Sequence, residues 1–356
     1  MIHRSTAFGQ TTSEGDEMNS KKRGLQTVEL TAPPYLTASA AIVGQKEGNG
    51  PLKDRFDQIE PDAYFAQKTW EKGESNMFER CLTLACQKTQ LKPDQLDYIF
   101  SGDLQNQCAG AAYAVRSTNA PYFGLYGACS TMAESLALAA MMIDGGFAHT
   151  CAAMTGSHFC TAERQYRFPL GYGGVRTPTA QWTVTGAGSV ILSDKGPGPQ
   201  VTFITVGKII DLGVKDISNM GAAMAPAAYD TLKTHFNDTG RRPEDYDLIV
   251  TGDLGHLGHS IVTELFHQDG ITLKNYDDCG RIIFDREKQD VHAGGSGCGC
   301  SAVVLAGHLL KKMQEGTLHR LLFAATGALM SPTTSMQQET IPGICHAVSI
   351  EVKQET

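Results

Sequence analysis

An internal repeat constrains the fold of this 356-residue chain more than any other feature of its sequence. Residues 93–104 read PDQLDYIFSGDL and residues 243–254 read PEDYDLIVTGDL, so each matched position lies 150 residues further along. Ala-Cys-Ser at 128–130 and Gly-Cys-Ser at 299–301 are each followed, 27 residues after the cysteine, by the glycine of a Thr-Gly pair. Self-similarity of this length indicates two copies of one structural unit.

The repeated unit alternates β-type apolar runs with helical periodicity, which predicts an α/β fold with mostly parallel sheets covered by helices. Lys-Gly-Pro-Gly-Pro at 195–199 is the clearest linker in the chain. We therefore expect an N-terminal half over 25–199 and a C-terminal half over 200–356. The polar residues 1–24 are expected to be disordered.

A pseudo-twofold axis between the halves would make several positions equivalent. Asp103 and Asp253 would follow equivalent strands, and Cys129 and Cys300 would begin equivalent helices. Ligands of α/β folds gather at the carboxyl ends of strands, so these positions are candidates for a binding site. An aspartate in such a place can also serve only to cap the following turn.

The turn Tyr-Gly-Ala-Cys-Ser-Thr-Met at 126–132 brings a cysteine to the start of an apolar helix that ends at the double glycine 145–146. Because this helix is apolar nearly all round, we expect it to be buried at the centre of the molecule. Cys129 would then lie at the positive end of the helix dipole, beside unpaired backbone N–H groups. That position suits an activated thiolate or a bound anion. The alternative is a cysteine that serves as a small core residue.

Charge and cysteine content exclude several classes of function. The net charge is −8 and the one basic cluster is short, which disfavours nucleic acid as a partner and unaided adsorption to an anionic membrane. The polar residues 1–26 contain no signal-peptide core, and no apolar run reaches the length of a membrane span. The ten cysteines therefore indicate reduced thiols of a soluble intracellular protein. Cys298 and Cys300 lack a second pair at zinc-site spacing, so no metal site is predicted.

Six stretches of the sequence carry a resemblance to a known family. They are GLYGACST at 124–131, PTAQWTVTGAG at 178–188, NMGAAMAPAA at 219–228, DYDLIVTGDLG at 245–255, AGGSGC at 293–298 and HAVSIE at 346–351. The chain resembles the thiolase and ketoacyl-synthase superfamily, and within it the stage V sporulation protein AD (SpoVAD) family of endospore-forming bacteria. The resemblance extends over about 48–351.

The resemblance implies a five-layer αβαβα fold built from two duplicated halves. It also implies a role in loading dipicolinic acid, as its calcium chelate, into the developing spore. Members of the family are taken to be the soluble dipicolinate-binding component of a membrane transport assembly. The expected partners are thus other SpoVA-type membrane proteins, at the periphery of the spore inner membrane. Thiolase relatives pair edge strands of their first halves, so a homodimer is expected, and no cofactor is implied.

The resemblance makes Cys129 the counterpart of the superfamily nucleophile, but the partners of that nucleophile are missing. Where the superfamily has Gly-His or Gly-Asn, this chain has Gly-Gly-Ser-Gly at 294–297. The other partner loop has Gly252-Asp253, with His256 three residues later as a poor substitute. A thiol without a base or polarising groups is a weak condensing catalyst. The sequence therefore favours a non-catalytic binding protein, with an acyl transferase that uses Cys129, or a purely structural partner in a membrane complex, as alternatives.

Dipicolinate is a flat aromatic ring with two carboxylates, and candidate binding residues follow from that chemistry. Helix-start N–H groups and arginine clamps would bind the carboxylates, and an aromatic side chain would stack on the ring. The candidates are Cys129, Ser130, Thr131, Asp103, Asn106, Gln107, His158, Arg164, Arg167, Trp182 and Cys300, with Arg176 and Tyr166 as substitutes for the clamp and the stacking ring. Each arginine can instead pair with a surface carboxylate.

Overall fold

The computed structural model describes residues 20–166 and 176–353. The strands of the first half lie in the order β6-β5-β7-β9-β3, and those of the second half in the order β12-β11-β14-β15-β10. The two orders are the same when the halves are matched, so the internal repeat of the sequence is a repeat of topology. The strands are β3 (Tyr35–Gly44), β5 (Tyr98–Gly102), β6 (Tyr122–Gly124), β7 (Thr150–Ser157), β9 (Gly186–Ser193), β10 (Gln200–Thr205), β11 (Leu248–Thr251), β12 (Tyr276–Asp278), β14 (Arg320–Ala328) and β15 (Gly343–Glu351).

The sheets are mixed, which corrects the expectation of mostly parallel strands. β5 pairs in parallel with β6 and β7, whereas β9 runs antiparallel to both β7 and β3. The second half repeats this pattern, with β15 antiparallel to β14 and β10. The last strand of each half reverses direction, and the two half-sheets meet where Gln200 of β10 pairs with Tyr35 of β3.

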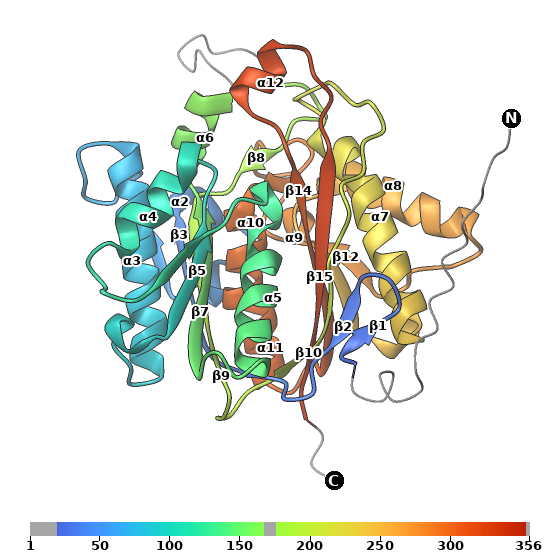
Figure 1. Cartoon of the computed structure of the whole chain (residues 1–356). Coiled ribbons are helices and arrows are strands. Elements are labelled where there is room, and N and C mark those ends of the chain that lie inside the picture. The colour runs from blue at the N-terminus through green and yellow to red at the C-terminus, as the bar shows by residue number, and fades with distance from the viewer. Residues whose placement is uncertain (1–19, 167–175, 354–356) are drawn as a thin grey trace, which may run out of the picture.

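Five layers are visible in Figure 1: helices α3 and α4, the first half-sheet, a central helical layer, the second half-sheet, and helices α7 and α8. The central layer consists of α5 and the consecutive helices α10, η7 and α11, which are packed between the two half-sheets. Each layer buries apolar surface against the next, as layered α/β architectures require. The helices are α3 (Trp70–Lys88), α4 (Ala109–Val115), α5 (Thr131–Asp144), α7 (Met220–Thr239), α8 (Gly255–Gln268), α10 (Cys298–Val304), η7 (Leu305–Leu309) and α11 (Leu310–Gln314).

The remaining elements are short and connect or cover the layers. β8 (Trp182–Thr183) and β13 (Gly295–Ser296) form a separate two-stranded parallel sheet. Thr183 and Ser296 of these strands line the cavity described in the next subsection. α6 is a helix over Phe159–Tyr166. The others are β1 (Lys22–Arg23), β2 (Thr27–Glu29), β4 (Gln58–Glu60), α2 (Gln45–Gly48), α9 (Cys279–Ile282), α12 (Pro332–Met336) and the 3-10 turns η1 (Lys53–Arg55), η2 (Pro93–Gln95), η3 (Asn106–Cys108), η4 (Ala128–Ser130) and η6 (Pro243–Asp245).

Residues 1–19, most of the segment expected to be disordered, lie outside the described residues, as do 167–175 and 354–356. Where the structure describes the end of that segment, Lys22 and Arg23 form strand β1. The carboxylate of Asp238, near the end of α7, accepts hydrogen bonds from the backbone N–H groups of the three residues 25–27. The N-terminal strands are therefore tied to the outer helix of the second half. The proposed boundaries between the halves remain a prediction.

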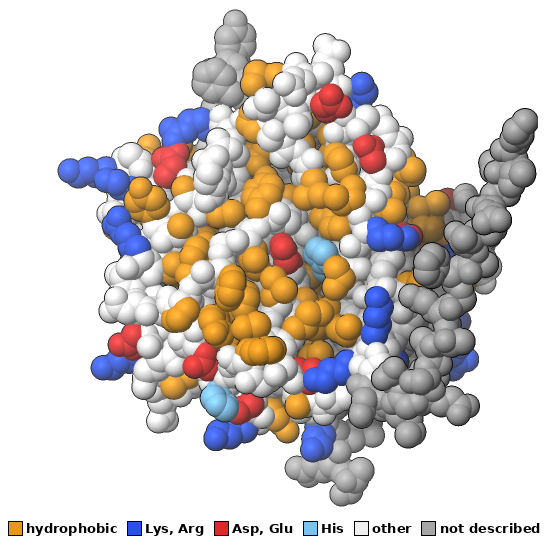
Figure 2. Space-filling model, viewed as in Figure 1, with side chains coloured by type: hydrophobic (Ala, Val, Ile, Leu, Met, Phe, Trp, Pro, Cys, Tyr) orange, Lys and Arg blue, Asp and Glu red, His pale blue; other side chains and the backbone are white. Residues whose placement is uncertain are grey.

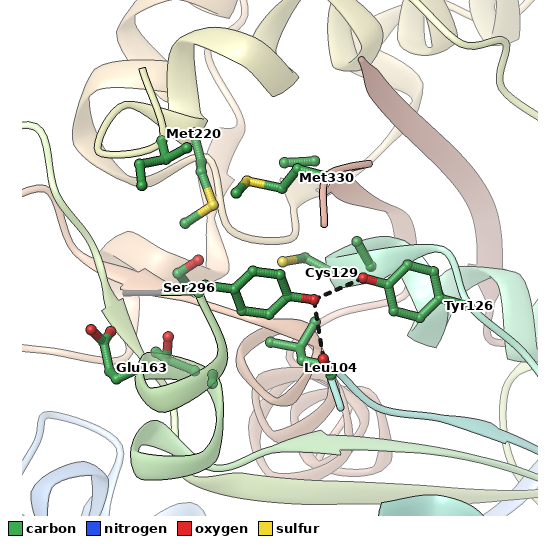
Figure 3. A pocket seen from close by; sticks show the side chains of 13 residues that line it. Leu104, Tyr126, Cys129, Glu163, Met220, Ser296 and Met330 are labelled. Carbon is green, nitrogen blue, oxygen red and sulfur yellow. Dashed lines mark hydrogen bonds between the residues drawn. The ribbon is translucent and has the colours of Figure 1, made fainter. Parts of the chain in front are cut away.

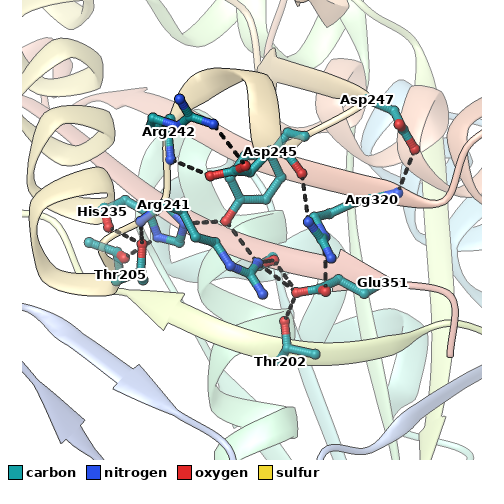
Figure 4. A network of polar contacts seen from close by, with 12 residues as sticks. Thr202, Thr205, His235, Arg241, Arg242, Asp245, Asp247, Arg320 and Glu351 are labelled. Atoms are coloured by element: carbon teal, nitrogen blue, oxygen red, sulfur yellow. Dashed lines mark hydrogen bonds and ion pairs between the residues drawn. The ribbon is translucent and has the colours of Figure 1, made fainter. Parts of the chain in front are cut away.

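A partly buried polar network lies between the end of α7 and the second half-sheet (Figure 4). Arg241 Nη1 donates to Glu351 Oε1 at 2.7 Å, and Arg320 Nε donates to Glu351 Oε2 at 3.1 Å. His235 Nδ1 lies 2.7 Å from the hydroxyl of Thr205, and burial lowers the pKa of His235 to about 3. These contacts join α7 to β10, β14 and β15, so the network is structural and leaves no open site.

Candidate functional site

A small cavity lies at the upper end of the central layer, where η4, α6, β13 and the start of α7 meet (Figure 3). The volume open to the centre of a water-sized sphere is about 50 Å³, enough for a few water molecules. Most of its wall is apolar, aromatic or sulfur-containing. The lining residues are Leu104, Tyr126, Ala128, Cys129, Ala162, Glu163, Tyr166, Thr183, Ile217, Met220, Ser296, Ala328 and Met330.

Cys129 enters the cavity from a tight turn that precedes α5. Ala128 has a φ of +51°, a left-handed conformation that is unfavourable for a residue with a Cβ. Ser130 Oγ donates to the carbonyl of Gly127 at 2.7 Å, and Thr131 Oγ1 donates to the carbonyl of Ala128 at 2.7 Å. Both hydroxyls are therefore used inside the turn. Cys129, Ser130 and Thr131 were all predicted to bind the ligand. Cys129 lines the cavity, whereas Ser130 and Thr131 are not among its described lining residues.

Asp253 follows β11 and lies directly behind Cys129. Its carboxylate accepts hydrogen bonds from Gly297 N at 2.9 Å, from Thr326 Oγ1 at 2.9 Å and from Ser296 Oγ at 3.2 Å. The side chain has no solvent-exposed surface. Three donors on one buried carboxylate satisfy it as a charged acceptor.

Burial and Asp253 together keep the Cys129 thiol neutral. Loss of hydration is the largest cause, followed by the negative charge of Asp253, and these raise the pKa of Cys129 well above its usual value. Burial also raises the pKa of Asp253, to about 6. Of the alternatives that the helix start left open, the raised pKa favours a neutral, core-like thiol over an activated thiolate.

No histidine lies in the described lining of the cavity. His256 is in the first turn of α8, where its backbone N–H donates to the carbonyl of Ala293. Burial and the nearby charges of Arg286 and Arg281 lower the pKa of His256. The weak expectation that His256 replaces the missing base has no support from this placement.

Aromatic and thioether side chains close the cavity opposite Cys129 (Figure 3). The hydroxyls of Tyr126 and Tyr166 lie 2.9 Å apart, and Tyr166 also donates to the carbonyl of Leu104 at 3.1 Å. Burial raises the pKa of both tyrosines, so both are neutral. Met220 and Met330 complete the wall. Their flexible side chains allow the cavity to enlarge around a ligand.

Several predicted site residues form contacts elsewhere. The carboxylate of Asp103 accepts from Gln105 N and Ala111 N, both at 2.7 Å, so it caps α4 as the alternative reading stated. His158 Nε2 lies 2.7 Å from the carbonyl of Ala63, and burial lowers the pKa of the ring. Asn106 and Gln107 belong to η3, outside the cavity lining.

The predicted clamp and stacking residues also lie away from the cavity. Arg164 is paired with Glu71 and lies over the ring of Trp70. Trp182 stacks on Phe159 with ring centroids 3.8 Å apart, and its neighbour on β8, Thr183, is the residue that reaches the cavity. Arg167 lies outside the described residues.

Arg176, the substitute clamp, lies over the Trp182 ring and pairs with Asp290 at 2.9 Å. In the second half, Cys298 rather than Cys300 packs against Cys129, together with Leu104 and Ala162. The internal repeat had matched Cys129 with Cys300, but the cysteine that lies beside the site is Cys298.

The most important contact that the sequence did not show is between Asp253 and Cys129. The repeat had identified Asp253, but only as the counterpart of Asp103, because matched sequence positions do not reveal which side chains cross between halves. No sequence pattern indicated that Tyr126, Met220 and Met330 would line the cavity. Tyr126 and Met220 do occur inside quoted family stretches.

In the described part of the chain, no cluster of three or more His, Cys, Asp or Glu side chains is arranged to hold a metal ion. None of the described helices combines the length and the apolar character that crossing a bilayer requires. All ten cysteines are free thiols.

Solved structures with the same arrangement are thiolase-fold proteins. Human mitochondrial 3-ketoacyl-CoA thiolase in complex with CoA superposes with a TM-score of 0.56 at 12% identity, over 92% of this chain and 99% of that one. 3-Oxoacyl-[acyl-carrier-protein] synthase III from Aquifex aeolicus VF5 gives 0.53 at 13% identity, over 90% and 100%. A variant of OleA from Xanthomonas campestris gives 0.55 at 13% identity, over 94% and 100%. The fold is thus thiolase-like, with five αβαβα layers.

Sequence comparison narrows this class. The family described as Stage V sporulation protein AD (SpoVAD) matches residues 24–351. Stage V sporulation protein AD of Bacillus subtilis (strain 168) is 45% identical over 332 residues, which covers 93% of this chain and 98% of that protein. The chain belongs to the SpoVAD family of sporulation proteins.

Proposed function

We propose that this protein is a non-catalytic binding protein for dipicolinic acid that acts in dipicolinate uptake into the developing spore. The observation that carries the proposal is the pair formed by Cys129 and Asp253. A condensing enzyme needs a thiolate beside neutral donors, whereas here burial and the nearby charge of Asp253 raise the pKa of the thiol. Membership of a sporulation family supports the biological setting.

The cavity chemistry supports a flat aromatic ligand. Tyr126 and Tyr166 offer ring faces, and the two methionines offer polarisable surface. The hydroxyl of Tyr166 donates to Leu104 O, and the N–H groups of Ser130 and Thr131 donate to Gly127 O and Ala128 O, so a ligand carboxylate would have to compete with these contacts. Because the present volume is about 50 Å³, binding requires displacement of Met220 or Met330.

Titration calorimetry tests the proposal directly. Sodium dipicolinate, with and without calcium, should give saturable heat with the wild-type protein, and the variant Tyr166→Ala should weaken it at least tenfold because a stacking surface is lost. Asp94→Asn, on the exposed turn η2, is a matched surface control. Absence of heat with the wild type at millimolar ligand contradicts the proposal.

Acyl transfer through Cys129 is the competing function, since the superposed thiolase and synthase are enzymes. Incubation with acetyl-CoA followed by intact-mass measurement separates the two. Under the binding proposal no adduct forms. An adduct in the wild type that is absent from Cys129→Ser supports the enzyme.

We further propose that the protein works as a homodimer with other SpoVA-type membrane proteins, at the periphery of the spore inner membrane. Apolar side chains gather in the middle of one face of the molecule (Figure 2). Phe123 on the edge strand β6 is 46% exposed. Analytical ultracentrifugation should show a dimer for the wild type and a monomer for Phe123→Glu, and a wild-type monomer at micromolar concentration contradicts the dimer.

A further inference from the structure

We propose that Asp253 takes up one proton when a dicarboxylate ligand enters the cavity. This inference rests on the binding function proposed above and makes Asp253 a positioning residue behind the cavity wall. Binding would then be coupled to pH through a group that does not itself touch the ligand.

The geometry places Asp253 one side chain away from the cavity. Its carboxylate lies 3.2 Å from Ser296 Oγ, and its charge raises the pKa of the Cys129 thiol; Ser296 and Cys129 both line the cavity. A ligand carboxylate that contacts Cys129 or Ser296 is therefore separated from Asp253 by a single bridging group. Water is excluded from this contact, since Asp253 is completely buried.

The charges around the cavity make two adjacent anions unfavourable. The described lining contains Glu163 as its one charged side chain, and none of its residues is a lysine or arginine. A second negative charge beside ionised Asp253 would be repelled strongly in these dry surroundings. Neutralising Asp253 removes that repulsion, and its pKa of about 6 makes the proton available near neutrality.

The hydrogen bonds of Asp253 can accommodate the added proton. The ionised carboxylate accepts from Ser296, Gly297 and Thr326. A protonated carboxyl keeps acceptor capacity and gains one O–H donor. That O–H can donate to Cys129 Sγ, and the thiol S–H is then free to donate to a ligand oxygen. The proton comes from bulk solvent, and no covalent bond changes.

Other titratable groups near Asp253 are neutral thiols or competing carboxyls. Burial raises the pKa of each of these thiols, so they are already neutral; they are Cys129, Cys298, Cys279, Cys300 and Cys345.

Two carboxyls compete with Asp253 for the proton. Asp278, whose pKa burial and then the charge of Asp253 raise to about 7, accepts from Leu254 N, Gly255 N and Gly280 N and is not among the lining residues of the cavity. Glu163 is the competing carboxyl within the lining.

Calorimetry with sodium dipicolinate, free of calcium, counts the protons. Titrations near neutral pH in two buffers of different ionisation enthalpy should give an uptake close to one proton per ligand. The ligand carboxyls are ionised in this range. The affinity should fall about tenfold for each pH unit above the pKa of free Asp253. Binding with no proton uptake and a flat pH profile overturns the inference and leaves the proposed binding function intact, whereas no binding at all removes both.

Variants identify the group. Asp253→Asn carries a permanent amide donor, so we expect it to bind without proton uptake and with a flat pH profile. Glu47→Gln is the matched control, because Glu47 is an equally buried carboxyl, with its pKa raised to about 7, that lies outside the cavity lining; it should keep the uptake. Loss of uptake in Glu163→Gln with retention in Asp253→Asn overturns the assignment. If Asp253→Asn fails to fold, Glu163→Gln and Asp278→Asn carry the test. Proton uptake that persists in both variants supports Asp253, and loss of uptake in either one overturns the assignment.

Discussion

The residue that gave the sequence its first functional signal, Cys129, shows how a local motif can mislead about charge state. Its position at the start of α5 was predicted correctly from the turn and the apolar helix. The sequence did not predict that its thiol is neutral, because the pKa of Cys129 depends on burial and on Asp253, which is remote in sequence. The local sequence pattern indicates where a residue lies in a helix or turn, but tertiary packing determines which groups surround its side chain.

At this scale we predict slow alkylation of Cys129. A neutral thiol with 5% of its surface exposed should react with iodoacetamide at neutral pH much more slowly than Cys160, which is partly exposed. Asp253→Asn removes a negative charge that raises the thiol pKa, so alkylation should become several-fold faster. Peptide mapping by mass spectrometry measures both rates, and equal rates in the two proteins would contradict the role given to Asp253.

Among the elements, α3 carries a buried carboxyl that the site does not use. Glu74 Oε2 accepts from Gln105 Nε2 at 2.7 Å and from Thr161 Oγ1 at 2.6 Å, whereas Oε1 has no hydrogen-bond partner among the described residues. Burial, and then the charge of Asp103, raise the pKa of Glu74 to about 8. An acid whose folded pKa is raised favours the folded state while protonated.

The pH dependence of stability follows from that shift. The contribution of Glu74 is fully present below its unfolded pKa of about 4.5 and is lost as pH rises through about 8. At about pH 8, Glu74→Gln should therefore increase the free energy of unfolding by roughly 2 kcal/mol and raise the melting temperature. At about pH 5 the substitution should change both quantities little. Glu79→Gln, on the same helix, should have no such effect in differential scanning calorimetry.

Helix α6 shows where prediction at the level of elements failed. The polar and aromatic residues 161–182 predict a long loop, yet residues 161–166 of that stretch belong to the helix Phe159–Tyr166, and residues 167–175 lie outside the described residues. Ala162 and Tyr166, one helical turn apart, both face the cavity. Eight residues are too few for periodicity to distinguish a helix from a loop, and packing against the cavity decides the outcome.

The whole molecule depends on a central layer that both halves share. α5 from the first half packs against β14 and β15 of the second, and α10 from the second packs against β7 and β9 of the first. The largest apolar cluster includes Leu136 and Val303 from these two helices. Each half therefore completes the core of the other.

This interlocking predicts that neither half folds alone. A fragment of residues 1–199 would expose the apolar surface of β7, β9 and α5, so it should lack near-ultraviolet circular dichroism and aggregate. Co-expression with residues 200–356 should restore a soluble complex. A stable monomeric N-terminal fragment with cooperative thermal unfolding would contradict the shared core.

The fold was more predictable than the site, for physical reasons. The repeat and the resemblance indicated two halves and five layers, because topology follows from patterns spread along the chain. The site depends on a few contacts across the interface between halves, such as Asp253 with Cys129 and Cys298 with Leu104. Arg164 and Trp182 were chosen for suitable chemistry, but Arg164 is paired with Glu71 and Trp182 stacks on Phe159.

The buried, uncharged sulfur of Cys129 has a consequence for the resistance of the protein to oxidation. Peroxides attack cysteine through its thiolate, and oxidation beyond the sulfenic acid is largely irreversible. A thiol that is shielded from solvent and held in its protonated form should therefore resist oxidative damage for long periods without repair.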